Sequence, residues 1–134
     1  MPVILVVDDN PQMVELIQEL VQFAGYDTEV AYSGLEGLDK ARDGMPDLIL
    51  VDLMMPEMNG WEVYHQLREF STIPVIFVTA YDTPQNKAKA EKLGAAGFIS
   101  KEKVPIELAQ QIQLVLMNEA RLVNPRKPRK EYLH

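Results

Sequence analysis

The sequence predicts an α/β protein built on a five-stranded parallel sheet with five helices distributed over both faces. Two continuous aliphatic runs, Val3–Val7 and Leu48–Val51, lack the polar alternation of a half-exposed strand. Such runs are typical of strands that are buried on both faces of a parallel sheet. Strand-like and helical segments alternate five times along 134 residues, a length that suits one domain with a substantial core.

The first strand, Val3–Val7, leads into a helix with clear signals at both ends. Asn10 followed by Pro11 is typical of an N-cap with proline at the first helical position. Gly25 suits the left-handed residue that ends a helix. The residues between them recur at helical spacing and predict its buried face: Met13, Leu16, Ile17, Leu20, Val21 and Ala24.

A second strand is predicted from Tyr26 to Ala31, and a second helix follows it. Ser33 and Glu36 have the spacing of a capping box, and Gly44 is the expected end of this helix. We expect the helix to turn three side chains inward: Leu35, Leu38 and Ala41.

The third strand, Leu48–Val51, precedes a helix that begins at Asn59-Gly60. Its apolar positions are Val63, Leu67 and Phe70. Residues 74–79 read as a fourth strand. Thr83 then caps a fourth helix that ends at Gly94; its apolar residues are only Ala88, Ala90 and Leu93. Such a helix is either a weakly anchored switch element or an ordinary solvated helix.

Residues 96–100 predict a short fifth strand, and Pro105 opens a long last helix that runs to about Val123. Helical spacing gives this helix two apolar stripes. The first, a core stripe, consists of Leu108, Ile112, Val115 and Leu122. The second consists of Ile106, Leu114 and Met117 beside Arg121. The second stripe is either scattered surface apolar residues or part of a surface for self-association or for a partner.

Composition excludes several classes of protein. The chain has no cysteine, which rules out disulfides and thiolate zinc sites. No apolar run approaches the roughly 20 residues of a membrane span, and no basic segment precedes the first strand, so we expect a cytoplasmic protein without a membrane segment. Residues 1–123, the predicted domain, carry a net charge of -10, which argues against direct nucleic-acid binding. Residues 124–134 carry +3 and two prolines and read as a basic tail or linker.

Polar residues follow the predicted strands at the edge where ligands gather in open α/β sheets. They are Asp8 and Asp9 after the first strand, Asp52 after the third, Thr79 in the fourth and Lys101 after the fifth. Alone, Asp52 would most simply be a turn residue. Clustered carboxylates repel one another and suit a hard cation such as Mg²⁺. A nearby lysine and hydroxyl would complete a site for phosphoryl transfer to Asp52.

This arrangement resembles the receiver domain of two-component response regulators over roughly residues 1–120. The matching features are Asp8-Asp9, Asp52 followed by Met55-Pro56 and Gly60, Thr79-Ala80, and Lys101 three residues after Phe98. The resemblance implies a flavodoxin-like, doubly wound (βα)₅ fold. It also implies a phosphorylation-controlled binding module rather than an enzyme that turns over an external substrate.

The resemblance implies that Asp52 becomes a 4-aspartylphosphate by accepting a phosphoryl group from a sensor histidine kinase or phosphotransfer protein. Asp9, Asp52 and the backbone carbonyl of Met54 would bind Mg²⁺ (or Mn²⁺), and Asp8 would assist through water. Phosphorylation would alter a surface made by the fourth helix, fifth strand and fifth helix, where a partner or a second copy would bind.

The resemblance further implies that Lys101 and Thr79 bind the phosphoryl oxygens and that Phe98 turns into the space that Thr79 leaves. One position departs from the family, which usually has proline where Glu102 follows Lys101. Because a non-proline cis peptide costs about 2.5–4 kcal/mol, we expect a trans bond there. Glu102 also adds negative charge near the site.

Three other functions remain as alternatives. An Asp-nucleophile phosphatase would have a second Asp two residues after the first, where this chain has Met54. A flavin or nucleotide binder would have a glycine- or hydroxyl-rich phosphate loop after the first strand, where Asp8-Asp9-Asn10 offers negative charge instead. A degenerate receiver would act as an interaction module without phosphorylation.

Overall fold

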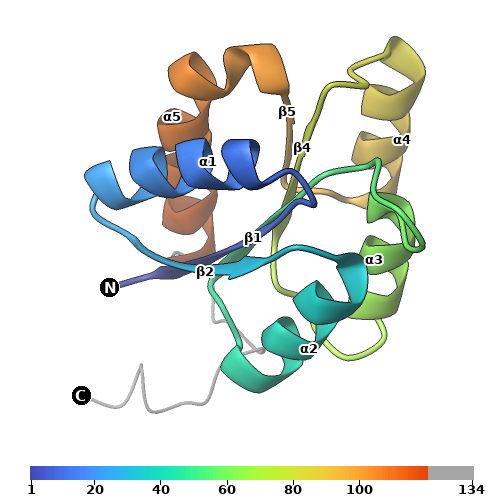
Figure 1. Ribbon diagram of the computed structural model, residues 1–134, viewed down its shortest axis with the longest axis horizontal. Helices are drawn as coiled ribbons and strands as arrows, with labels where there is room; N and C mark the ends of the chain where they lie inside the picture. Colours follow the sequence, from blue (N-terminus) through green and yellow to red (C-terminus); the bar gives the residue numbers. More distant parts are fainter. Residues whose placement is uncertain (121–134) are drawn as a thin grey trace.

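Five parallel strands form a single sheet in the order β2-β1-β3-β4-β5. The computed structural model describes residues 1–120 (Figure 1). The strands are β1 (Val3–Val7), β2 (Asp27–Ala31), β3 (Leu48–Val51), β4 (Val75–Thr79) and β5 (Gly97–Ser100). The chain runs outward from β1 to β2, returns to β3 on the other side of β1, and continues to β5. The predicted doubly wound fold is confirmed.

Five α-helices connect or follow the strands, as predicted. They are α1 (Pro11–Phe23), α2 (Gly34–Gly44), α3 (Gly60–Leu67), α4 (Pro84–Leu93) and α5 (Val104–Ala120). A single 3₁₀ turn, η1 (Lys101–Lys103), joins β5 to α5. Helices α1 and α5 cover one face of the sheet, and α2, α3 and α4 cover the other (Figure 1).

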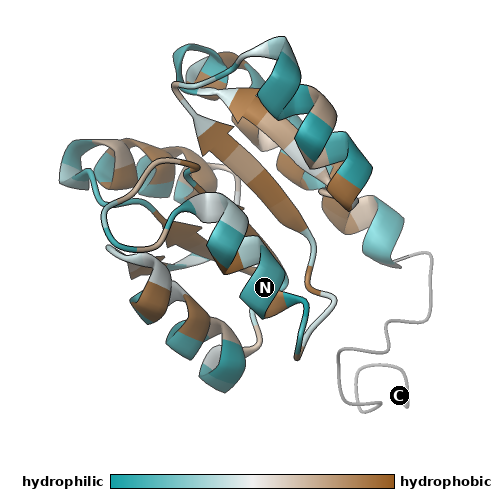
Figure 2. Ribbon diagram, turned by 90° about the vertical axis from the view of Figure 1, so that its right-hand side faces the viewer, coloured by the Kyte–Doolittle hydropathy of each residue, from teal (hydrophilic) through white to brown (hydrophobic). Residues whose placement is uncertain are grey.

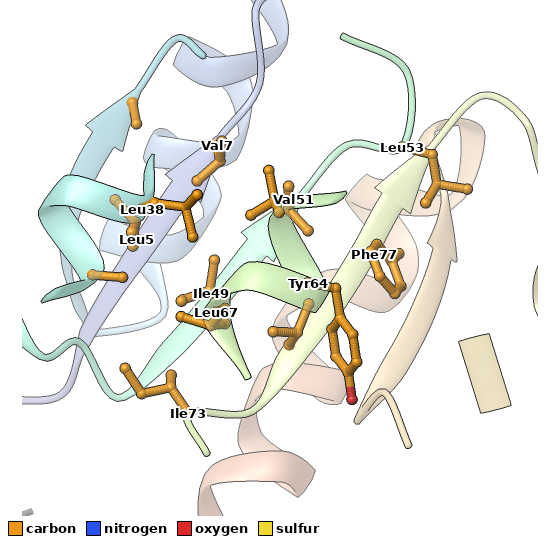
Figure 3. Close-up of a cluster of buried hydrophobic side chains, with 14 of the residues drawn as sticks. Leu5, Val7, Leu38, Ile49, Val51, Leu53, Tyr64, Leu67, Ile73 and Phe77 are labelled. Atoms are coloured by element: carbon orange, nitrogen blue, oxygen red, sulfur yellow. The ribbon is translucent and has the colours of Figure 1, made fainter. Parts of the chain in front are cut away.

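Two apolar clusters lie on the two faces of the sheet. The larger one packs Leu5, Ile49 and Phe77 against α2 and α3 (Figure 3). The other packs alternate strand residues against α1 and α5. Hydropathy colouring shows strands that are mainly hydrophobic and helices in which hydrophobic and hydrophilic residues alternate (Figure 2). Residues of β3 and β4 are buried throughout, which explains their unbroken apolar sequences.

The helix ends follow the predicted signals with two differences. Asn10 and Thr83 cap α1 and α4 through their side chains. At α2, the Ser33 side chain accepts a hydrogen bond from the Glu36 N–H, but the Glu36 carboxylate accepts from Tyr32 N–H rather than from Ser33. Helix α2 ends at Gly44, as predicted, but the left-handed residue is the following Met45, with φ 46°.

Three predicted core residues are exposed: Ala24, which follows the last residue of α1, Leu35 and Phe70. Leu35 is 62% exposed because α2 presents its glycines to the interior instead. A Cβ on Gly37 would lie 2.8 Å from Val7, so the absence of side chains lets the helix approach the sheet. Phe70 is 38% exposed because α3 ends at Leu67, before the helical period would bring Phe70 inward.

Helix α5 begins at Val104, one residue before the predicted start at Pro105. Leu108 and Ile112 are buried and Val115 is partly buried, as expected for the core stripe. Leu122, Arg121, the predicted end at Val123 and the tail 124–134 lie outside the described residues. Within residues 1–120, no helix is both long and apolar enough to cross a membrane.

Helix α4 is weakly anchored, in agreement with its sequence. Ala90 is its only buried residue, while Ala88 and Leu93 are exposed. The hydroxyl of Tyr64 in α3 donates a hydrogen bond to the Leu93 carbonyl, 2.8 Å away. Because α4 buries little apolar area, its displacement requires only a small free energy.

Candidate functional site

Three carboxylates gather at the carboxyl ends of the two central strands. Asp8 and Asp9 follow β1 and Asp52 follows β3, and one oxygen of each lies within 4.8 Å of the others. Strands β1 and β3 are neighbours with Val7 opposite Val51. The Asp52 N–H donates to the Val7 carbonyl at 3.1 Å, which extends the ladder and sets the two strand ends side by side.

Burial differs sharply among the three carboxylates. Asp8 is 2% and Asp52 is 5% exposed, whereas Asp9 is exposed. Asp8 Oδ1 accepts a hydrogen bond from the Asn10 N–H at 2.9 Å, while its buried Oδ2 accepts none. Burial raises the pKa of Asp8, and the nearby Asp52 charge raises it further, against the lowering effects of the Asn10 hydrogen bond and Lys101.

Lys101 places its ammonium between the two buried carboxylates. Its Nζ donates to Asp52 Oδ2 at 2.9 Å and lies 3.1 Å from Asp8 Oδ2. The second contact is a charge interaction without hydrogen-bond geometry. Burial lowers the pKa of Lys101, but the hydrogen bond to Asp52 and the two negative charges outweigh this effect and raise it overall.

Thr79 and Phe98 lie on β4 and β5 beside this cluster. Thr79 is fully buried, and its hydroxyl oxygen accepts a hydrogen bond from the Tyr81 N–H at 3.1 Å. Among the described residues, no hydrogen bond joins Thr79 to Asp52 or Lys101. Phe98 is partly buried, pairs with Phe77 across the strands and packs against the larger apolar cluster. Their predicted movement upon phosphorylation stays a prediction.

Two residues shape the site in ways that are not predicted from the sequence. Asn10, predicted only as a helix cap, also orients Asp8 through its backbone N–H. Gly60 lies against the strand end, because a Cβ there would be 2.4 Å from the Asp52 carbonyl oxygen. The Asp8-Asp9-Asn10 order is a signal for the first, since Asp commonly accepts from the N–H two residues on. The second depends on packing that only the fold creates.

The loop between β3 and α3 carries Met54, whose N–H donates to Asp52 Oδ1 at 3.3 Å. Its predicted carbonyl contact to a metal stays a prediction. Glu57 in the same loop has φ 67°, an uncommon conformation for a residue with a side chain. Glu102 is exposed, and no cis peptide bond occurs in residues 1–120, as expected for the bond after Lys101.

Residues 4–113 match the family described as the response regulator receiver domain. The chain belongs to this family. The receiver domain is 37% identical over 115 residues to the polar-differentiation response regulator DivK of Brucella ovis, covering 84% of this chain and 91% of DivK. It is also 37% identical over 124 residues to the hybrid signal transduction histidine kinase D of Dictyostelium discoideum. That match covers 90% of this chain but only 8% of the kinase.

Solved receiver domains share the same architecture. The receiver domain of the Francisella response regulator 1452 superimposes with a TM-score of 0.82 at 29% identity, covering 88% of this chain and 98% of that one. A CheY-like receiver domain protein from Methanospirillum hungatei JF-1 gives 0.80 at 30% identity, covering 90% and 98%. The chain is therefore a receiver domain of the kind found in two-component signalling.

The carboxylate cluster of this receiver domain suits a hard divalent cation. Mg²⁺ is bound by carboxylate and carbonyl oxygens and retains several waters. Three carboxylates offer oxygens within 4.8 Å of one another, and Lys101, the one cation that residues 1–120 place against them, offsets only part of their charge. The buried Asp8 Oδ2, which accepts no hydrogen bond, is a further acceptor that a metal-bound water would satisfy.

Proposed function

We propose that Asp52 is the phosphoacceptor and that it receives its phosphoryl group from a phosphohistidine of a sensor histidine kinase or phosphotransfer protein. The observation that carries this proposal is the hydrogen bond from Lys101 Nζ to Asp52 Oδ2, made beside two further carboxylates. A cation held against one carboxylate oxygen is well placed to stabilise the negative charge of a phosphoryl group that becomes attached to this carboxylate.

In the transfer step, one carboxylate oxygen of Asp52 attacks phosphorus and forms a P–O bond. The P–N bond to the donor histidine breaks, and its electron pair stays on the imidazole, which takes up a proton. Asp9, Asp52 and the backbone carbonyl of Met54 are the groups that would hold Mg²⁺ or Mn²⁺, and Asp8 would act through water. When bound, the metal would neutralise part of the negative charge on the phosphoryl oxygens.

After transfer, the ammonium of Lys101 and the hydroxyl of Thr79 bind phosphoryl oxygens. For this, Thr79 gives up its hydrogen bond with Tyr81 N–H, and Phe98 turns toward the vacated space. Weak anchoring of α4 supports its displacement at the same time. Position 54 has no acid, so we expect only slow self-dephosphorylation and no turnover of an external substrate.

The output surface proposed for this switch consists of α4, β5 and α5. Ile106, Leu114 and Met117 of α5 are 75%, 58% and 47% exposed, so their side chains are available for a partner or for a phosphorylation-dependent homodimer. The net charge of -10 over residues 1–123 supports the view that this domain does not bind nucleic acid directly. A cytoplasmic location stays a prediction from the sequence.

The decisive experiment is incubation with acetyl phosphate and Mg²⁺, read by intact mass. We expect the wild-type protein to gain the mass of one phosphoryl group and Asp52→Ala to gain none. Asp9→Asn should still be phosphorylated in excess Mg²⁺, but more slowly than wild type. Failure to gain phosphoryl, together with no Mg²⁺ binding by calorimetry, would contradict the proposal and favour a degenerate receiver. A gain that persists in Asp52→Ala would assign the acceptor elsewhere.

A further inference from the structure

A cavity of about 470 Å³ opens at the amino-terminal edge of the sheet, opposite the edge that carries Asp52. It lies between the end of α2 and the segment that joins α3 to β4. Both segments precede strands, β3 and β4, so the cavity is separated from the carboxylate cluster by the length of those strands. Its lining includes Ala41, Arg42, Met45, Arg68, Phe70 and Ile73.

Both arginines of residues 1–120 line this one cavity. They are Arg42 and Arg68, which lie 26 positions apart in the sequence. The surrounding protein is strongly acidic, so two guanidinium groups at one opening form a local positive site on a negative molecule. This concentration of cations marks the cavity as a candidate for an anionic ligand.

Each guanidinium lies over an aromatic ring. The Arg42 Cζ lies 4.4 Å from the centre of the Phe70 ring, and the Arg68 Cζ lies 4.5 Å from that of Tyr64. Tyr64 itself is buried in the larger apolar cluster, which holds its ring in place. Such stacking pre-orders the arginine side chains and lowers the entropy that binding would cost.

Most of the N–H groups on these arginines have no protein partner among the described residues. Arg68 uses one Nη1 hydrogen bond to the Ser71 carbonyl, at 3.2 Å. Arg42 makes one ion pair, 3.6 Å from Asp39, between side chains that are 57% and 63% exposed, a pair of little energetic weight. Since a guanidinium carries five donors, several stay available at the rim of the cavity.

We propose that this cavity binds a small organic anion, a carboxylate or phosphate group carried on an apolar body. The planar donor forks of Arg42 and Arg68 match the oxygen pairs of such groups. Ala41, Phe70 and Ile73 also line the cavity and offer apolar contact to the rest of the ligand. The volume lies within the range of about 300–1,000 Å³ that is typical of small-molecule sites.

The competing explanation is that the arginines serve only to hold α2 against α3. In that case, replacing them would lower stability, and no anion would bind at this edge. The two explanations differ in a binding measurement, so stability alone does not decide between them.

The probes are benzoate and phenyl phosphate, with benzamide as the neutral match and inorganic phosphate as the anion without an apolar body. Each is titrated into the full chain while amide chemical shifts are followed by NMR. We expect benzoate and phenyl phosphate to shift amides of residues 41–45 and 68–73 saturably, with Kd on the order of 1 mM. Benzamide and inorganic phosphate should bind at least roughly tenfold more weakly than benzoate.

Four variants test the role of the arginines. Arg42→Met and Arg68→Met should each weaken benzoate binding roughly tenfold, while Arg68→Lys should restore only part of the loss, because lysine keeps the charge without the fork. Lys92→Met, which removes an exposed cation from α4, should leave binding unchanged. Thermal midpoints of these four variants and of the Arg42→Met, Arg68→Met double variant establish that all of them are folded.

Any of three results would overturn the proposal. The first is no saturable shift at residues 41–45 and 68–73 with either aromatic anion. The second is equal affinity for benzoate and benzamide, or for benzoate and inorganic phosphate, since one of the two recognition elements would then contribute nothing. The third is unchanged affinity in a folded Arg42→Met, Arg68→Met double variant.

Discussion

The ammonium of Lys101 lies 2.9 Å from Asp52 Oδ2 and 3.1 Å from Asp8 Oδ2, so one cation serves two buried carboxylates. The three residues come from segments that follow β1, β3 and β5. Strands β1 and β3 are adjacent, but β5 is separated from β3 by β4. The long side chain of Lys101 therefore reaches past the end of β4 and links the segment after β5, at the edge of the sheet, to the central strands β1 and β3.

Replacing Lys101 by methionine should leave the repulsion between the Asp8 and Asp52 carboxylates without an offsetting cation. We expect Lys101→Met to lower the free energy of unfolding by about 1–3 kcal/mol in metal-free buffer, measured by urea denaturation. Mg²⁺ should restore part of this loss by binding the native state. The matched control is Lys103→Met, an exposed cation in the same turn, for which we expect less than about 0.5 kcal/mol.

The destabilisation by Lys101→Met should also depend on pH. The pKa of Lys101 is raised above 10.5 in the folded protein, so its stabilising contribution is complete below 10.5 and is lost as pH rises through the raised pKa. The difference in the free energy of unfolding between wild type and Lys101→Met should therefore become smaller at strongly alkaline pH. Equal stability at neutral pH without Mg²⁺ would contradict the view that Lys101 offsets the carboxylate repulsion.

Replacing Asp8 by asparagine should stabilise the metal-free protein at neutral pH. The raised pKa of Asp8 means that the folded state favours its protonated form, so this residue lowers stability as pH rises from 3.8 through the raised value. The side chain of Asp8→Asn resembles the protonated form. The stability of this variant should therefore exceed that of wild type increasingly across that pH interval, and the difference should persist at higher pH. Urea denaturation in the presence of a chelator at several pH values measures this.

The same substitution should weaken the binding of Mg²⁺. We expect Asp8→Asn to lower Mg²⁺ affinity by roughly tenfold or more, as is usual when an outer partner of a metal site is lost. In wild type, affinity should fall as pH decreases through the raised pKa of Asp8, because protonation removes a negative charge. A variant with unchanged Mg²⁺ affinity would exclude Asp8 from the metal site.

A side chain at Gly60 should disturb Asp52 directly. In Gly60→Ala the new Cβ would lie 2.4 Å from the Asp52 carbonyl oxygen and 2.8 Å from Leu53 Cα, both backbone atoms that move only with the strand end. We expect a loss of about 2–3 kcal/mol in stability and slower phosphorylation by acetyl phosphate. Gly44→Ala is the control, since its Cβ would meet only the flexible carboxylate of Glu29, at 3.1 Å, and should change stability by less than about 1 kcal/mol.

The exposed face of α5 should mediate association if the proposed output surface is correct. With beryllofluoride bound as a phosphoryl mimic, light scattering should report a mass increase that Ile106→Glu and Leu114→Glu abolish. Phe23→Ser is the control, because Phe23 is 94% exposed but lies on α1, which is not part of the proposed output surface. A wild-type protein that stays monomeric with the mimic at high concentration would contradict self-association.

Local sequence determined most of the architecture. Buried parallel strands have no solvent face, so Leu48–Val51 and its equivalents must be apolar throughout, and caps such as Asn10 and Thr83 act on the turn that follows them. The candidate site was predictable for the same reason. Strand ends in a parallel sheet share one edge, so residues that directly follow strands meet there whatever the packing details.

Packing decided what local sequence left open. Leu35 and Leu38 are both apolar positions of α2, and only the close approach of Gly37 to Val7 determines that Leu38 is buried and Leu35 exposed. Similarly, neither Arg42 nor Arg68 has a local pattern that distinguishes it from a solvated arginine. Their shared cavity arises because α2 packs on α3, a contact between distant segments that no short stretch of sequence encodes.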